Sequence, residues 1–376
     1  MKGLGCRDYD KQGRLLSGPS FATVPAGRQE ASEGQAIYMI NKDAKLIDNL
    51  IDTKNVQMVP TRDGFGKGLV EAGEKDQRVV ALCADLSEST RFHWFAQKFP
   101  ERFIQMGVAE QNLATVASGM ANYGKIPFIG SYAAFSPGRN NEQIRTTISL
   151  NHVPVKVVGC HAGISVGPDG ATHQQLEDIV LMRVQPNMIV VVPCDAVEAQ
   201  KATLAIAFNN EPSYIRLGRE KSWVFTTPQT PFKIGRAEVL RNPSTSSGQA
   251  DVAIIGCGIL LYNALVAAEE LAKEQIDCMV INSHTVKPLD EETIIGAAKK
   301  CGAVVSVEEH QINGGLGSAI AECLSRNYPV PQEYIGVQNR FGESGDPFEL
   351  IEALGMGVAS IKDAIKRAMK RKGHSS

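Results

Sequence analysis

The sequence predicts an α/β protein built from two successive open, mostly parallel sheets, each covered by helices. Short apolar runs rich in Val and Ile alternate with longer segments whose apolar residues recur at the spacing of a buried helix face. Strands that are apolar on both faces are typical of parallel sheets covered on both sides. A chain of 376 residues is also long enough for two such units.

The first sheet is expected within residues 56–218, the first predicted domain. Apolar runs predict strands at 79–86, 103–108, 126–132, 153–163, 188–193 and 213–218. Segments with helical spacing lie between them, at 62–75, 110–123, 138–150, 174–183 and 195–209. Prolines and polar residues interrupt this alternation at 219–234, so that segment is interpreted as the linker between domains.

The second domain is expected over residues 235–376. Its strands are predicted at 236–241, 251–258, 278–283 and 303–310, and its helices near 259–274, 290–300, 315–326 and 360–371. The Ser/Thr-rich segment between the first two of these strands is interpreted as a long, flexible hairpin loop. Residues 1–55 show no sustained period and are interpreted as an N-terminal extension that docks on a partner, with a short helix near 43–52.

Composition excludes several classes of protein. The formal net charge of −2 argues against a nucleic-acid surface, which needs a basic excess. No apolar run is long enough to span a membrane, and the N-terminus lacks the apolar core of a secretory signal. The eight cysteines are scattered without the pairs of a zinc site, which favours reduced thiols and a cytoplasmic protein.

Glu110 is a lone acid at the start of a predicted helix that is otherwise apolar on one face. Leu113, Val116, Ala117 and Met120 repeat there at the spacing of a buried helix. One interpretation is helix electrostatics, because an acid near a helix N-terminus is favoured by about 0.3–1 kcal/mol. The alternative is a functional acid held in a buried site.

His161, Asp169 and His173 lie in a Gly-rich loop that follows a predicted strand. Ligands of open α/β sheets bind outside the carboxyl ends of the strands, where this loop is expected. Two imidazoles and a carboxylate could bind the hydroxyls and move the protons of a polar substrate. In the alternative interpretation, the Asp169 segment is only a turn and Thr172 caps a helix. The irregular spacing and the lack of a thiol argue against a metal site.

Arg62, Ser89 and Arg219 also fall at predicted strand ends or helix starts, as does Asp85. Each arginine alone is more often a solvated surface residue. Together, two arginines and a serine at one edge of a sheet would suit a phosphorylated substrate, because charge-assisted hydrogen bonds to phosphate are strong.

Two further motifs have a structural and a functional interpretation. Tyr132 and Phe135 leave a strand for a loop, where they either pack in the core or present an aromatic face to a flat heterocycle. Gly314, Gly315 and Gly317 suggest a phosphate loop, but neither the dinucleotide nor the P-loop signature is complete. A tight turn from strand to helix is the favoured interpretation of these glycines.

In this order, the motifs resemble the pyrimidine-binding and C-terminal domains of the transketolase family over roughly residues 56–370. The resemblance is carried by "GVAEQNLA", "YAAFSPGR", "GPDGATHQ", "RVQPNM", "VPCDAVEA" and "GRE". It implies thiamine diphosphate as the cofactor, with Glu110 hydrogen-bonded to the aminopyrimidine ring so that the cofactor's thiazolium carbon can lose its proton. Glu110 is catalytic in this interpretation, which favours the functional acid over helix electrostatics.

The resemblance also implies roles for the other residues. Phe135 would stack on the aminopyrimidine and Asp85 would approach the thiazolium side of the cofactor. A sugar phosphate would be held by Arg62, Ser89, His161 and Arg219. Asp169 would contact a substrate hydroxyl, and His173 would be catalytic at a hydroxyl near the reacting carbons.

The sequence lacks the GDG…N motif with which this family binds Mg²⁺ and diphosphate. The resemblance therefore implies one subunit of a split transketolase. A separate N-terminal subunit would hold Mg²⁺ and share the cofactor, and self-association through the pyrimidine-binding domain would give a heterotetramer. No metal site is expected in this chain itself. The transfer of a two-carbon ketol unit from a ketose phosphate to an aldose phosphate is the implied activity.

Three alternatives remain open. The β subunit of a 2-oxo acid dehydrogenase shares the layout and the cofactor acid, but it would have no use for sugar-phosphate ligands such as His161 and Arg219. A deoxyxylulose-phosphate synthase-like enzyme would retain the loop motif, although such enzymes are normally one long chain. A non-catalytic assembly partner would have no need of Glu110, Asp169 and His173.

Overall fold

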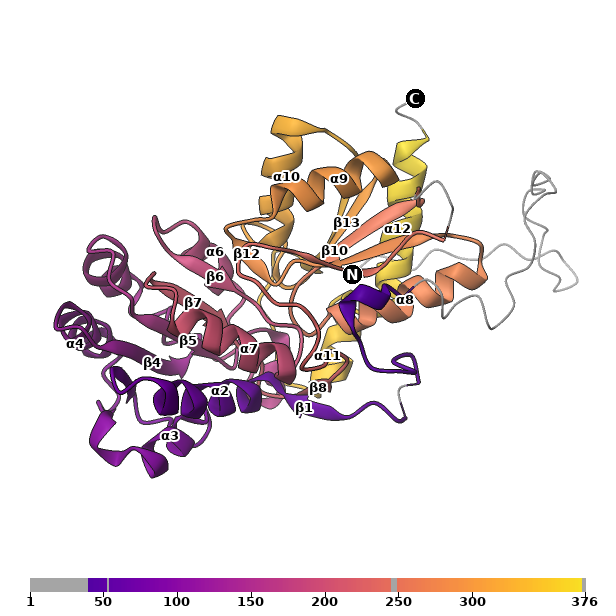
Figure 1. The fold of residues 1–376 in the computed structure, drawn as a ribbon. Coiled ribbons are helices and arrows are strands. Elements are labelled where there is room, and N and C mark those ends of the chain that lie inside the picture. Colours follow the sequence, from indigo (N-terminus) through magenta and orange to yellow (C-terminus); the bar gives the residue numbers. More distant parts are fainter. Residues whose placement is uncertain (1–39, 53, 245–248, 374–376) are drawn as a thin grey trace, which may run out of the picture.

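The structure is a computed structural model that describes residues 40–52, 54–244 and 249–373. It contains two sheets covered by helices, as predicted, with the first in the indigo to magenta half of the chain and the second in the orange to yellow half (Figure 1). The N-terminal extension predicted at 1–55 lies mostly outside the described residues, which begin at residue 40. Among those described, no helix is long and apolar enough to cross a membrane.

The first sheet has the strand order β12-β6-β7-β5-β4-β2-β3. All strands from the first domain run parallel, and β12, which comes from the second domain, is antiparallel at one edge. The strands are β2 (Val79–Cys83), β3 (Phe103–Gln105), β4 (Ile126–Tyr132), β5 (Lys156–Cys160), β6 (Ile189–Val191), β7 (Ser213–Arg216) and β12 (Thr285–Lys287). The second domain thus completes the first sheet, which joins the two domains.

Helices cover both faces of this sheet. One face carries α2 (Thr61–Lys75), α3 (Phe92–Lys98) and α7 (Ala196–Ala207), whose apolar residues share one buried cluster. The other face carries α4 (Glu110–Asn122), α5 (Asn141–Gln143), the π-helix η4 (Ile144–Ser149) and α6 (Asp178–Arg183). Helices α2 and α7 approach so closely that a Cβ at Gly64 would lie 1.8 Å from the Ala196 carbonyl oxygen, so only glycine fits there.

The second sheet has the order β14-β13-β10-β11-β9. Its strands are β9 (Glu238–Arg241), β10 (Val252–Gly256), β11 (Cys278–Asn282), β13 (Val304–Gln311) and β14 (Gln332–Val337). Helices α8 (Leu261–Lys273) and α12 (Val358–Lys372) pack on one face, and α9 (Glu291–Cys301) and α10 (Leu316–Asn327) on the other. The predicted hairpin is wrong: β11 lies between β9 and β10, because β9 pairs antiparallel with β11 instead.

Several elements differ from the sequence-based expectation. The helix α6 begins only at Asp178, because the segment before it forms the 3₁₀ helix η5 (Ile164–Asp169) and a turn. The helices α3 and α11 (Pro347–Ala353) and the strands β12 and β14 were not predicted. The segment interpreted as a linker contains β8 (Lys221–Trp223), which pairs antiparallel with β1 (Met58–Pro60).

The described part of the N-terminal extension packs on the second domain and on the segment 219–234 of the same chain. Ile40 forms a bridge to Arg241, the Tyr262 hydroxyl donates to the Leu50 carbonyl at 2.7 Å, and the Ile47 amide donates to Phe225. The expected helix near 43–52 is wrong. Only a 3₁₀ helix, η2 (Lys42–Ala44), forms, and it ends at Lys45, whose backbone is left-handed.

Candidate active site

The carboxyl ends of the parallel strands carry the candidate residues. His161 follows β5 directly, Arg219 follows β7, and Phe135 lies in the loop after β4. Glu110 begins α4, which follows β3. Because these strands run side by side in the order β7-β5-β4-β2-β3, their ends bring residues from distant parts of the chain to one edge.

Glu110 is buried, with 2% of its surface exposed. Its Oε2 accepts a hydrogen bond from Nη1 of Arg139 at 2.7 Å, and its Oε1 lies 3.4 Å from the donating Ser131 hydroxyl. Asn140 donates to the Glu110 backbone carbonyl at 2.9 Å. The carboxylate is therefore tied to the end of β4 and to the loop behind it. These contacts give Glu110 a role beyond that of a helix-start charge.

Four rings form an aromatic cluster beside this acid. Tyr132 stacks on His161 with ring centroids 3.8 Å apart, and on Phe135 at 6.0 Å. His173 and Phe135 form a T-shaped contact with ring centroids 5.4 Å apart. The guanidinium of Arg139 lies over the Phe135 ring at 4.7 Å, so the partner of Glu110 and the ring of Phe135 are in direct contact. The ring of Phe135 is thus linked to the acid through Arg139, to His173 directly and to His161 through Tyr132.

His161 is buried and adopts a left-handed backbone at φ 56°. Burial, followed by the positive charge of Arg62, lowers its pKa to about 2, so the ring is neutral at physiological pH. Nε2 of His161 lies 3.3 Å from Nη1 of Arg62. Since a guanidinium can only donate, Nε2 must accept, and the proton of the neutral ring is on Nδ1. Among the described residues, this buried Nδ1 has no hydrogen-bond partner, so its proton is an unsatisfied donor.

Arg62 and Arg219 lie near this histidine, and the charges of both contribute to lowering its pKa. Arg62 donates to the backbone carbonyl of Ser89 at 2.7 Å. Arg219 pairs with Asp169 at 3.3 Å and donates to the Val166 carbonyl. Burial lowers the pKa of Arg62, and the charge of Arg91, followed by that of Arg219, adds to the effect. The structure therefore brings Arg62, His161 and Arg219 into one positively charged region.

Within the described residues, no hydrogen bond joins the side chains of Asp85 and Ser89 to this region. Asp85 is exposed after β2 at φ 58°, and its amide donates to the side chain of Gln105 at 2.8 Å. In the described part of the chain, no hydrogen bond or ion pair joins the Asp85 carboxylate to the residues above. Ser89 contacts Arg62 through its backbone oxygen rather than its hydroxyl. Among the described residues, no cluster of three or more His, Cys, Asp or Glu side chains could hold a metal ion.

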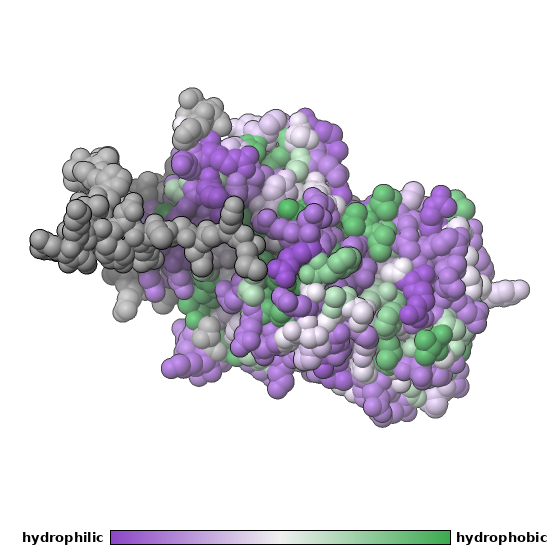
Figure 2. Space-filling view, turned by 180° about the vertical axis from the view of Figure 1, so that it is seen from behind, coloured by the Kyte–Doolittle hydropathy of each residue, from purple (hydrophilic) through white to green (hydrophobic). Residues whose placement is uncertain are grey.

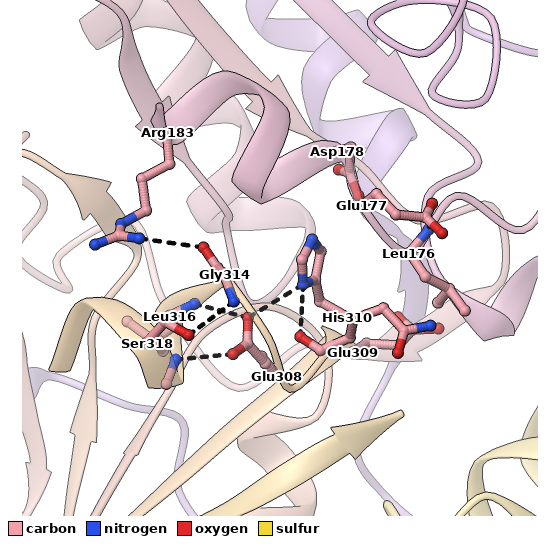
Figure 3. Close-up of polar contacts among 12 residues, drawn as sticks. Leu176, Glu177, Asp178, Arg183, Glu308, Glu309, His310, Gly314, Leu316 and Ser318 are labelled. Carbon is pink, nitrogen blue, oxygen red and sulfur yellow. Dashed lines mark hydrogen bonds and ion pairs between the residues drawn. The ribbon is translucent and has the colours of Figure 1, made fainter. Parts of the chain in front are cut away.

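The glycine-rich turn before α10 is occupied by an internal acid. Glu308 accepts hydrogen bonds from the amides of Leu316 and Gly317, both at 2.8 Å, and Figure 3 shows its carboxylate at the first turn of α10. A Cβ at Gly315 would lie 2.0 Å from Oε2 of Glu308, which explains that glycine. The carboxylate fills the position that a phosphate would need. The nucleotide interpretation is therefore wrong, and the tight-turn interpretation is confirmed.

Sequence reasoning did not single out Arg139 as a site residue. It lies four residues after Phe135, and only the tertiary structure turns its guanidinium back toward Glu110. Arg216 was missed because it belongs to a buried strand, where its Nε donates to Asp178 at 2.7 Å. A charged residue inside an apolar strand was the signal that could have marked Arg216.

Comparisons with known proteins agree with this architecture. Residues 57–222 match the family "Transketolase, pyrimidine binding domain", and residues 244–361 match "Transketolase, C-terminal domain". The 6-deoxy-6-sulfo-D-fructose transketolase subunit SqwH of Clostridium sp. (strain MSTE9) is 40% identical over 83% of this chain and 95% of its own length. Transketolase-like protein 2 of Mus musculus is 37% identical over 82% of this chain, which spans about half of that protein.

A solved structure described as a split gene transketolase, an inactive β4 tetramer, is also similar. Its chain is 43% identical, with a TM-score of 0.77 over 84% of this chain and 99% of that one. Both halves of the sequence, the fold and relatives of matching length thus point to one family. This chain belongs to the transketolase family and corresponds to the C-terminal section of a split transketolase.

Proposed function

We propose that this chain is the C-terminal subunit of a thiamine diphosphate-dependent transketolase and becomes active with a separate diphosphate-binding subunit. The observation that carries the proposal is the buried Glu110 carboxylate, joined through Arg139 to the half-buried ring of Phe135. A transketolase needs these two groups in this subunit, an acid for a ring nitrogen and an aromatic face for the ring itself. A non-catalytic partner would gain nothing from burying such an acid.

The residues present fit the aminopyrimidine part of the cofactor. Glu110 offers a carboxylate oxygen in a dry site, and Phe135 offers a ring for stacking. When bound, thiamine diphosphate supplies a nucleophilic carbon that carries the two-carbon unit. Glu110 would hold the hydrogen bond to the ring nitrogen, and Phe135 would keep the ring in register with it. Asp85 is proposed on the thiazolium side.

The positively charged region is the proposed sugar-phosphate site. Arg62 and Arg219 would bind the anionic group, aided by the Ser89 hydroxyl and by the free Nδ1 proton of His161. Asp169 and His173 would contact hydroxyls, with His173 next to Phe135 and therefore near the reacting carbons. These residues would bind a sugar phosphate at both of its ends. A 2-oxo acid substrate would not require such contacts.

Two classes of substrate could supply the anionic group that the arginines bind. A ketose phosphate donor and an aldose phosphate acceptor are the first, because two arginines suit a doubly charged phosphate. A sulfonated ketose is the second, because the Clostridium relative is named for 6-deoxy-6-sulfo-D-fructose. In either case the chemistry is the transfer of a ketol unit between sugars in the cytoplasm.

The diphosphate and Mg²⁺ are assigned to the partner subunit. Contact surfaces for the partner and for a second copy of this chain are proposed on the first domain. Large apolar side chains are exposed there at Val108, Tyr123, Leu150 and Val184, with exposed fractions from 71% to 91%. On the face drawn in Figure 2, apolar residues gather in several separate patches among polar ones. Two copies of each subunit would give a heterotetramer.

Reconstitution tests the proposal. This chain would be purified alone and together with an N-terminal transketolase subunit from the same genome, and both preparations would be assayed for ketol transfer with thiamine diphosphate and Mg²⁺. Transfer by the mixture and not by either chain alone is expected. Donors would include a ketose phosphate, a 6-sulfo ketose and hydroxypyruvate, together with a 2-oxo acid as the control for a dehydrogenase subunit. Decarboxylation of the 2-oxo acid without ketol transfer would overturn the proposal.

A further inference from the structure

Two neighbouring acids near the end of β13, Glu308 and Glu309, are almost completely buried, with 1% and 4% of their surfaces exposed. Burial raises the pKa of each carboxyl above its usual range. Successive residues of a strand point to opposite faces of the sheet, so the two side chains leave β13 in different directions. Figure 3 shows both acids, with Glu308 turned to the backbone at the start of α10. Each carboxylate therefore serves a different neighbour.

Glu308 serves its own domain. Both of its oxygens accept amide hydrogens from the first turn of α10, which has no side-chain cap of its own. His310 lies 3.9 Å away and bonds to the Gln311 carbonyl. Glu308 is thus a helix cap within the second domain, and in the described part of the chain no hydrogen bond or ion pair joins it to the loop that carries Asp169.

Glu309 serves the other domain. Its Oε1 accepts the Ser165 amide at 2.5 Å, and Ser165 belongs to the 3₁₀ helix η5 of the substrate loop. The residue before η5, Gly163, provides no cap, so the second domain supplies one. A Cβ at Gly163, where φ is +89°, would lie 2.4 Å from the Glu309 carboxyl carbon. The loop backbone therefore fits directly against this carboxylate.

Further hydrogen bonds hold both Glu309 and the loop in place. Arg216, from β7, donates to the Glu309 backbone carbonyl at 2.8 Å while its Nε bonds to Asp178. At the far end of the loop, Gln174 donates to the Glu343 carbonyl at 2.9 Å, and the Gln311 amide donates to Leu176 at 3.0 Å. The second domain thus holds the loop at its beginning and at its end, with Asp169 and His173 between these points.

We propose that the C-terminal domain positions the substrate loop of the first domain, with Glu309 as the positioning residue. The consequence for catalysis rests on the proposed function, because it assumes that Asp169 and His173 contact the sugar. The structural part of the proposal, that Glu309 holds the loop, does not depend on the proposed function. Glu309 itself touches no substrate in this proposal. It acts through the Ser165 amide, which sets the conformation of η5 and of the residues that follow.

Hydrogen exchange of the whole chain tests the structural part. In Glu309→Ala, amides of residues 163–170 should exchange about tenfold faster, because a buried amide loses its acceptor, while the first turn of α10 stays protected. Glu308→Ala is the matched control and should show the reverse pattern. Glu309→Gln keeps an acceptor oxygen and should restore most of the loop protection. Equal exchange in the loop for Glu309→Ala and wild type would overturn the proposal.

Kinetics of the reconstituted complex test the consequence. Glu309→Ala should raise the KM for the sugar donor about tenfold and leave the apparent affinity for thiamine diphosphate unchanged, since within the described residues no hydrogen bond or ion pair joins Glu309 to Glu110 or Phe135. Glu308→Ala should leave both constants near wild type. If Glu309→Ala fails to fold, Glu309→Asp shortens the reach and serves instead. An inactive wild-type complex would remove the proposed function alone, whereas an active one with equal KM values in both variants would remove this inference.

Discussion

Arg139 and Glu110 form an ion pair in which Nη1 lies 2.7 Å from Oε2, although Glu110 is buried and about half of the Arg139 side chain is exposed. The guanidinium reaches the acid from over the ring of Phe135. A buried carboxylate is costly without such a partner. The pair therefore explains how this chain holds the buried acid in place where a cofactor ring is proposed to bind.

Arg139→Gln should destabilise the chain by about 1–3 kcal/mol, because it leaves the buried carboxylate with only the weaker Ser131 bond. Urea denaturation at neutral pH would measure the loss. The nearby, exposed Arg145→Gln is the control and should cost less than about 0.5 kcal/mol. Glu110→Gln in the Arg139→Gln background should recover part of the loss. Equal effects of the two arginine variants would show that the ion pair contributes nothing.

Glu110→Gln should lower turnover of the reconstituted enzyme by about 10²- to 10⁴-fold, the usual contribution of a general acid–base step. The amide is nearly isosteric, so the fold and the subunit complex should persist, and size-exclusion chromatography would confirm this. Pre-steady-state measurement of ketol transfer would give the rate of the chemical step in the variant and in the wild type. Turnover at the wild-type level would show that Glu110 has no catalytic role and only a structural one.

Arg62→Ala and Arg219→Ala should each raise the KM for a ketose phosphate by about 10- to 150-fold, because a charge-assisted bond to phosphate is lost. Hydroxypyruvate has no phosphate and should be affected little. Arg78→Ala is a suitable control, since Arg78 pairs with Asp76 at the opposite edge of the sheet, before β2. Similar damage with both donors would assign these arginines to the fold or to a subunit interface.

Thiamine diphosphate should bind this chain poorly in the absence of the partner, because the proposed ligands of diphosphate and Mg²⁺ belong to the other subunit. Titration calorimetry of the chain with thiamine diphosphate, with and without Mg²⁺, would measure this. Adding the partner should produce Mg²⁺-dependent binding. Tight, Mg²⁺-dependent binding by the chain alone would contradict the division of the cofactor between two subunits.

His161 should make stability depend on pH below neutrality. Its folded pKa is lowered to about 2 from an ordinary 6.5, so the unfolded chain binds the extra proton first. The contribution is complete above pH 6.5 and is lost progressively as the pH falls below it. The difference in unfolding free energy between wild type and His161→Gln should therefore shrink between pH 7 and pH 4. A difference independent of pH would show that His161 is not held neutral by its surroundings.

Local sequence patterns were sufficient to predict elements whose burial follows a simple pattern along the chain. The run 126–132 coincides with β4, and the helix expected at 110–123 differs from α4 by one residue. The continuous apolar run of β4 indicates a strand buried on both faces, and the helical period of α4 indicates which of its faces is buried. The family could be recognised for a related reason, since its motifs are continuous and sit at strand ends.

Other features depend on contacts between distant segments, which no local period records. β12 is three residues long and becomes a strand only because the edge of the other domain's sheet accepts it. β9 finds β11 rather than its sequence neighbour β10. The site shows the same division. The candidate residues at 110, 161 and 173 could be identified from the sequence. The contacts of Arg139 with Glu110 and of Glu309 with Ser165 join residues 29 and 144 positions apart, and they depend on which faces the folded sheets bring together.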